Sequence, residues 1–144
     1  MTRTSLTKVL EYREFTKEQL EAETAKARER LNSEQGKLDA LENKFTEASE
    51  EFSEKQQRGH IRVHDIQFFS TYCTHLNKEI RQQKAVVEHW TAELEKNRQA
   101  MLEAYKEHKV VELLHGRIAH AEMKEADKGE QKAADYGFLT RRGK

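Results

Sequence analysis

Apolar residues recur along most of this chain in alternating steps of three and four, and no proline interrupts them. In the first half, the positions of this repeat are Leu6, Leu10, Arg13, Lys17, Leu20, Thr24, Ala27, Leu31, Glu34, Leu38, Leu41, Phe45, Ala48 and Phe52. Most of them are apolar, and the spacing is that of a heptad a/d repeat. It predicts a long helix with one narrow apolar stripe, here called the helix 1 seam.

The second half repeats the same spacing in a new phase. Its positions, the helix 2 seam, are Ile66, Phe69, Cys73, Leu76, Ile80, Gln83, Val87, Trp90, Leu94, Asn97, Met101, Ala104, His108, Val111, His115, Ile118 and Glu122. Between the seams, Gly59 can adopt the positive φ that ends a helix, and Asp65 can cap the next one. We therefore expect one coiled-coil domain over 1–144, with helix 1 at about 5–56, a hinge at about 57–64, helix 2 at about 65–127 and a flexible tail at about 128–144.

A short connection between two helices makes them antiparallel neighbours, so the predicted fold is an all-α, two-helix coiled-coil hairpin. Folding about residue 60 places Leu6 near His115, and helix 2 then extends beyond helix 1 from about Ile118. The seam residues nearest the hinge are large and apolar, which predicts the richest packing there. The opposite, open end has charged residues on its seam, and we expect it to fray without a partner.

Composition narrows the functional classes. Charged residues make up 36% of the chain and apolar residues 35%, too few for a multilayered core. The 26 basic and 26 acidic residues balance, so nothing indicates a nucleic-acid partner. No apolar run approaches the length that spans a bilayer, and the first residues lack a signal-peptide core. The single cysteine, Cys73, suits a reducing compartment, and we expect the protein in the cytoplasm.

Residues that could carry chemistry are few. His60 and His64 have metal-ligand spacing but lie in the predicted hinge, where a solvated turn is the better interpretation. His108 and His115 lie on the seam, where polar residues setting the register are favoured over a pH-sensitive lock. Cys73 is predicted to be buried and unreactive. No phosphate loop or catalytic triad is present, so we expect no enzyme activity, cofactor, metal or small-molecule substrate.

Several apolar residues lie off the seam, where a hairpin alone does not bury them all. They are Phe68, Tyr72, Leu102, Tyr105, Val110, Leu113 and Leu114. Exposed apolar groups beyond the seam indicate contacts with other proteins.

Four stretches of the chain resemble the FliJ family. Residues 6–14 (LTKVLEYRE) are similar to its amphipathic start, and residues 69–80 (FSTYCTHLNKEI) to the opening of its second helix. Residues 109–114 (KVVELL) and 130–135 (EQKAAD) are similar to its closing pattern. Residues 136–144 depart from the family pattern.

This resemblance implies a non-enzymatic component of the bacterial flagellar type III export apparatus, cytoplasmic and peripheral to the inner membrane, that serves motility. FliJ proteins act as a stalk: they insert their open end into the hexameric export ATPase, promote its assembly and activity, and contact the cytoplasmic domain of the export gate. Some also bind export chaperones. By resemblance, the ATPase-binding residues are Leu6, Leu10, Arg13, Lys17, Arg117, Ile118 and Lys124. The gate-binding residues are Phe68, Tyr72, Leu76 and Glu79.

Two questions stay open at this point. The stalk protein of a virulence-type injectisome has the same architecture, and a structural coiled coil that dimerises through these seams would have the same repeat. We expect a monomer, because the heptad phase breaks once, near Gly59. Arg13 and Lys17 either splay outward toward an acidic ATPase lumen or extend past the seam into solvent.

Overall fold

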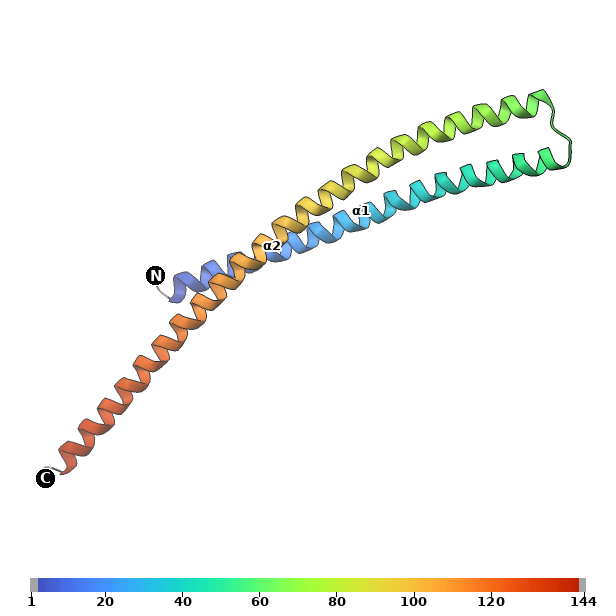
Figure 1. Ribbon diagram of the computed structural model, residues 1–144. Coiled ribbons are helices and arrows are strands. Elements are labelled where there is room, and N and C mark those ends of the chain that lie inside the picture. Colours follow the sequence, from blue (N-terminus) through green and yellow to red (C-terminus); the bar gives the residue numbers. More distant parts are fainter. Residues whose placement is uncertain (1–2, 143–144) are drawn as a thin grey trace. The chain divides into compact units, whose positions relative to one another are not determined.

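The computed structural model describes residues 3–142, and two long helices joined by a short loop contain nearly all of them (Figure 1). Helix α1 spans Arg3–Gln57 and helix α2 spans Val63–Arg142. The predicted all-α hairpin is confirmed. Residue contacts divide the chain into a hinge part, residues 22–99, and an open part, residues 3–21 with 100–142.

The loop begins with a helix-ending motif centred on Gly59. The N–H of Gly59 donates to the carbonyl of Gln56 at 3.2 Å, and the N–H of His60 donates to the carbonyl of Lys55 at 3.3 Å. This pair of bonds is a Schellman motif, which requires a left-handed residue. Gly59 supplies it with a φ of 72°. The predicted break at Gly59 is therefore confirmed.

Helix α2 begins two residues earlier than the predicted cap. The N–H of Ile66 donates to the carbonyl of Arg62, which makes Arg62 the capping residue of α2. Asp65 lies in the first turn instead, and its carboxylate accepts a hydrogen bond from the N–H of Arg62 at 3.1 Å. The prediction of Asp65 as the N-cap is wrong in position, but the side chain still satisfies a helix-terminal N–H, as in a capping box.

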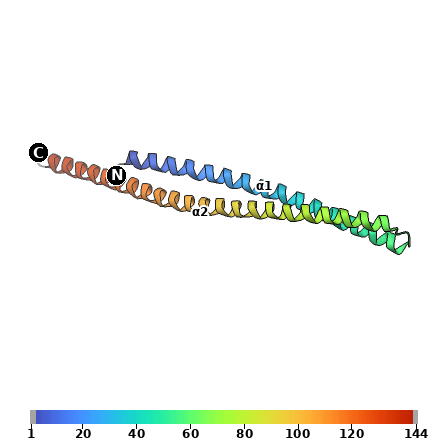
Figure 2. The same cartoon turned by 90° about the horizontal axis from the view of Figure 1, so that it is seen from above.

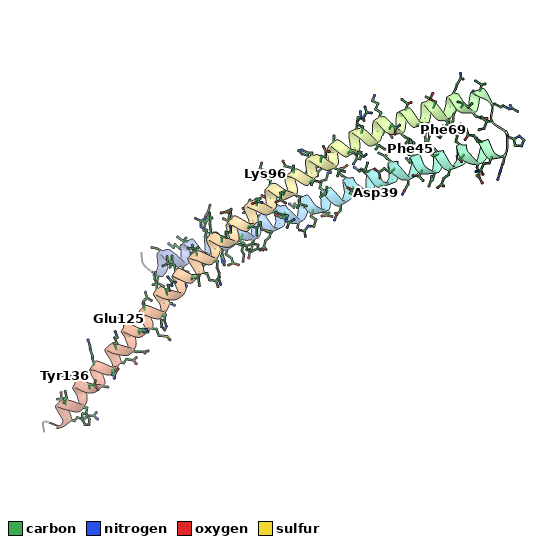
Figure 3. The ribbon with its side chains drawn as sticks, viewed as in Figure 1. Asp39, Phe45, Phe69, Lys96, Glu125 and Tyr136 are labelled. Carbon is green, nitrogen blue, oxygen red and sulfur yellow. The ribbon has the colours of Figure 1, made fainter. Side chains whose placement is uncertain are left out.

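The predicted end of helix 2 near residue 127 also differs from the structure, in which α2 continues to Arg142. Residues 128–142 contain Ala, Glu, Gln, Lys and Arg, which favour helix, and no proline. The two glycines in this stretch, Gly129 and Gly137, each cost about 1 kcal/mol but do not break a helix. Figure 3 shows Glu125 and Tyr136 on this continuous helix.

In the hinge part, α1 and α2 run side by side in both views (Figures 1 and 2). The seam positions of α1 are all buried or half-buried, with Ala27 and Leu38 among the most buried. Leu76 of α2 is 2% exposed. Phe52 and Phe69 stack with ring centroids 4.2 Å apart, and Figure 3 labels Phe69 together with Phe45 of α1. Antiparallel pairing in the predicted register is thereby confirmed.

Burial is uneven within the seam residues predicted to pack best on the hinge side: Leu38 and Leu76 are in the core as predicted, whereas the residues next to the loop are more exposed. Ile66, the first residue of the helix 2 seam, is 48% exposed. The last residues of α1, 53–57, are all polar and cannot cover it. Within the hinge part, the deepest burial lies farther from the loop, at positions such as Leu38 and Leu76.

In the open part, Leu6 is 1% exposed, the deepest burial of any large side chain in residues 3–142. Ala104 of α2 is also buried. The hydroxyl of Thr7 lies 3.1 Å from His115 Nε2, so the expected proximity of Leu6 to His115 is confirmed. From residue 120 to residue 136, α2 is exposed at every position.

Candidate protein-binding surfaces

Polar side chains connect α1 to α2 throughout the open part. Arg3 forms an exposed ion pair with Glu122 at 3.4 Å. Arg13 pairs with Glu107, and Tyr105 donates a hydrogen bond to Glu21 at 2.5 Å. Exposed ion pairs contribute little each, about 0–1 kcal/mol, so these contacts act mainly by fixing which residues face each other.

The two seam cations have partners within the chain. Besides the pair of Arg13 with Glu107, the ammonium group of Lys17 lies 3.5 Å from Glu14 and 5.7 Å from the ring centroid of Tyr105. The Lys17 side chain is only 19% exposed. In this structure the two cations therefore lie along the helix pair and do not extend away from it, and their contact with an ATPase stays a prediction.

His108 occupies the seam with its side chain 13% exposed, between carboxylates of both helices. Its Nε2 lies 2.7 Å from Glu14, and its Nδ1 lies 3.7 Å from Glu112. The hydrogen bond from His108, with the charge of nearby Lys17, lowers the pKa of Glu14, although partial burial opposes this. These contacts pair specific positions of α1 and α2, as expected of polar seam residues that set the register.

The other residues predicted to bind the ATPase fall into two groups. Leu6 is buried, and Leu10 and Ile118 are half-buried, so these three hold the helices together. Arg117 and Lys124 are exposed. Only this second group is freely accessible to another protein.

Exposed apolar side chains gather in the open part. Those predicted from the sequence are Leu102, Tyr105, Val110, Leu113 and Leu114, and all are exposed. Tyr12, Phe15 and Met123 are also exposed and were missed, and the two aromatic residues, Tyr12 and Phe15, are 64% and 57% exposed. The sequence could have revealed Tyr12 and Phe15, because both lie off the helix 1 seam. A large aromatic residue outside the seam has no partner helix to cover it and is therefore expected to be exposed.

A groove lies near the loop in the hinge part. Its volume is about 260 Å³, and it is lined by Lys44, Glu47, Ala48, Glu51, Phe52, Lys55, Asp65, Phe68, Phe69 and Tyr72. Phe68 and Tyr72 are near-parallel, with ring centroids 6.3 Å apart, and Phe68 is 69% exposed. The groove thus combines an aromatic floor with acidic side chains from both helices.

The residues predicted to bind the gate differ in accessibility. Phe68 is exposed and Tyr72 is half-buried, and both line the groove. Glu79 is half-buried, and its carboxylate lies 3.1 Å from His75 of the same helix. Leu76 is in the core, so its side chain supports the helix pair from inside.

Cys73 is half-buried beside these residues, and burial raises the pKa of its thiol. A raised pKa leaves less of the reactive thiolate near neutral pH. Among residues 3–142, no three His, Cys, Asp or Glu side chains come together as metal ligands would. Over the same residues, no helix is long and apolar enough to cross a membrane.

Two paired helices with apolar and charged side chains exposed in both parts define a coiled-coil protein suited to binding other proteins. Comparison with protein families identifies which one: the profile of the flagellar FliJ protein family matches residues 2–136. The chain belongs to the FliJ family, as its sequence motifs predicted. No curated protein and no solved structure matches the chain. Family membership implies a stalk protein of the flagellar type III export apparatus, in preference to the injectisome alternative.

Proposed function

We propose that this chain links the flagellar export ATPase to the export gate, with the open part binding the ATPase and the surface near the loop binding the gate. The observation that carries the proposal is the family match over residues 2–136. The two candidate surfaces support it, because they lie in different parts of the chain and differ in chemistry. Escort of export chaperones is a further expectation from the family.

At the open part, the proposed contacts are the exposed side chains. Arg117 and Lys124 supply positive charge, and Tyr12, Val110 and Leu114 supply apolar area. Leu6, Leu10 and Ile118 act indirectly, by keeping the two helices paired. Arg13 acts through its pair with Glu107, which fixes how α1 faces α2 beside these contacts.

At the hinge part, the proposed gate contacts are Phe68 and Tyr72, which line the groove, and Glu79, which lies about two turns beyond Tyr72 along α2. A large exposed aromatic side chain beside a groove is the kind of residue that dominates the energy of a protein interface. Leu76 is retained as a supporting core residue.

The ATPase contact is tested by stimulation of ATP hydrolysis by the purified export ATPase. Arg117→Glu with Lys124→Glu is expected to lower the apparent affinity by about tenfold at low salt, with a smaller effect at high salt, because exposed charges act on association and are screened. The matched control is Arg81→Glu with Lys84→Glu, which reverses two exposed charges in the hinge part. Unchanged stimulation by the first variant would remove the open part from the mechanism.

A charge swap separates the internal role of Arg13 from a direct contact. Arg13→Glu alone is expected to reduce stimulation, because it sets a carboxylate against Glu107. Adding Glu107→Arg restores an opposite-charge pair across the helices and should restore stimulation. If the swapped protein stays inactive although it is folded, Arg13 contacts the ATPase directly.

A further inference from the structure

The groove near the loop has a size that suits side chains of a protein partner. Its volume is about 260 Å³, whereas pockets for small molecules occupy about 300–1,000 Å³. Because a cavity of about 150 Å³ holds one benzene-sized group, the groove has room for about two large apolar side chains. The rings of Phe68 and Tyr72 line it, together with Phe69, which Figure 3 labels on α2.

Acidic side chains of α1 form one wall of this groove. Residues 45–54 contain four glutamates and no basic residue. Glu47 and Glu51 line the groove itself, and Lys44 and Lys55, which also line it, flank the acidic run. At about 100° per residue, the four glutamates share an arc of about 100° on α1. All four are exposed, and together they line a hollow that adjoins the groove: Glu47, Glu50, Glu51 and Glu54.

We propose that this groove takes a basic, amphipathic helical segment of its protein partner. The inference rests on the proposed gate contact and deepens it by giving the chemistry of the gate segment. The apolar face of the segment fills the space beside Phe68 and Tyr72, as amphipathic helices do in apolar grooves. Its lysine or arginine side chains, about one turn apart, face Glu47 and Glu51, because complementary charges set which partner docks and in which register.

The acidic wall disfavours the other occupants of such a groove. Nucleic acids and anionic lipid surfaces both present phosphates, which the glutamates repel. A second copy of this chain that docked through the same groove would set one acidic wall against the other, since a two-fold interface uses the same patch on both copies. Among protein segments, an acidic helix is repelled for the same reason.

The charges and the rings should contribute differently to affinity. Exposed ion pairs contribute little each, so two of them together correspond to about a fivefold change in affinity at low salt. Screening removes most of that change at about 0.5 M salt. Loss of the Tyr72 ring should weaken binding by about tenfold at either salt concentration, because buried aromatic side chains dominate the energy of protein interfaces.

The first test uses two labelled synthetic peptides of about 20 residues, titrated with the full-length protein and followed by fluorescence anisotropy. Both peptides have leucine at the same helical positions, and their polar positions are lysine in one and glutamate in the other. We expect only the lysine peptide to bind. Glu47→Gln with Glu51→Gln should weaken its binding by about fivefold at low salt, and Tyr72→Ala should weaken it by about tenfold.

The matched control is Glu23→Gln with Glu29→Gln, which neutralises two exposed glutamates of α1 that do not line the groove. This control should bind the lysine peptide like the unmodified protein, and circular dichroism should show the same helicity and melting temperature in every variant. Equal binding of the two peptides, an equal loss in the control, or unchanged binding by either groove variant would overturn the proposal.

The second test repeats the titration with the cytoplasmic domain of the gate and separates this inference from the proposed function. The Glu47→Gln with Glu51→Gln variant should again bind about fivefold more weakly at low salt. If Tyr72→Ala weakens gate binding and the glutamate variant does not, the gate contact stands and the proposed charge preference is wrong. If the gate domain does not bind but the lysine peptide depends on both groove variants, the proposed function fails and the groove chemistry stands.

Discussion

At the residue scale, the most informative position is Glu34, a carboxylate that is 3% exposed in the apolar seam of α1. Gln83 of α2 donates hydrogen bonds to its carboxylate at 2.7 Å and to its backbone carbonyl at 2.9 Å. Arg30 and Lys37 pair with the same carboxylate at 3.1 and 3.2 Å. A buried carboxylate is tolerated because all these partners surround it.

The hydrogen bond from Gln83 is the largest cause of a lowered pKa at Glu34; Lys37 and Arg30 add to the lowering, and burial opposes it. A lowered pKa contributes stability above the ordinary value of 4.5, and this contribution is lost as the pH falls through the lowered pKa. We predict that Gln83→Leu is less stable than the unmodified protein at pH 7, because it leaves the buried charge without its main donor. Urea midpoints should be measured for both proteins at neutral pH and below about pH 4. The midpoint should fall less on acidification in the variant than in the unmodified protein.

A second substitution provides the control for this prediction. Glu34→Leu with Gln83→Leu removes both polar groups and should recover the stability at pH 7, because replacing a satisfied buried pair by apolar residues is often neutral or stabilising. Equal midpoints for Gln83→Leu and the unmodified protein, with the same acid dependence, would show that this bond contributes nothing.

The heptad spacing is enough to place Glu34 on the helix 1 seam and Gln83 on the helix 2 seam, so both positions were predictable from the sequence. It did not pair them, because the pairing depends on how the hinge sets one helix against the other. The same limit explains Arg13 and Lys17: their seam positions were predictable, but their partners Glu107, Glu14 and Tyr105 lie off the seam.

At the scale of the elements, two glycines in open space have opposite expected effects. Gly59 has a φ of 72°, and nothing lies within 4 Å of a Cβ added there. Gly59→Ala should therefore destabilise the hairpin by about 1 kcal/mol through backbone strain alone. Gly36 lies inside α1, also with nothing within 4 Å, so Gly36→Ala should stabilise by about 1 kcal/mol. Thermal and urea unfolding measure both, and two changes of the same sign would contradict the assignment of Gly59 to a helix-ending motif.

The elements themselves were mostly predictable, and the exceptions have physical reasons. The loop was found because the heptad phase and Gly59 coincide. The end of α2 was missed because the seam stops near Glu122, whereas the helix is maintained beyond it by residues of high helix propensity. Loss of an apolar stripe marks the end of pairing and does not mark the end of a helix.

At the scale of the whole molecule, the proposed function gives one chain two different partners. The candidate surfaces of the open and hinge parts share no residue, so binding at one leaves the other available. A substitution in one surface should then affect one partner only. Tyr72→Ala removes a half-buried ring next to exposed Phe68 and should weaken gate binding with little change in helicity or melting temperature.

The most direct measurement is a binding assay with three components: this protein, the export ATPase and the cytoplasmic domain of the gate, followed by sedimentation velocity. We predict that the unmodified protein joins both partners in one complex. Tyr72→Ala should lose the gate domain and keep the ATPase, whereas Arg117→Glu with Lys124→Glu should do the reverse. Mutually exclusive binding of the two partners, or loss of both by either variant, would contradict the proposed link between ATPase and gate.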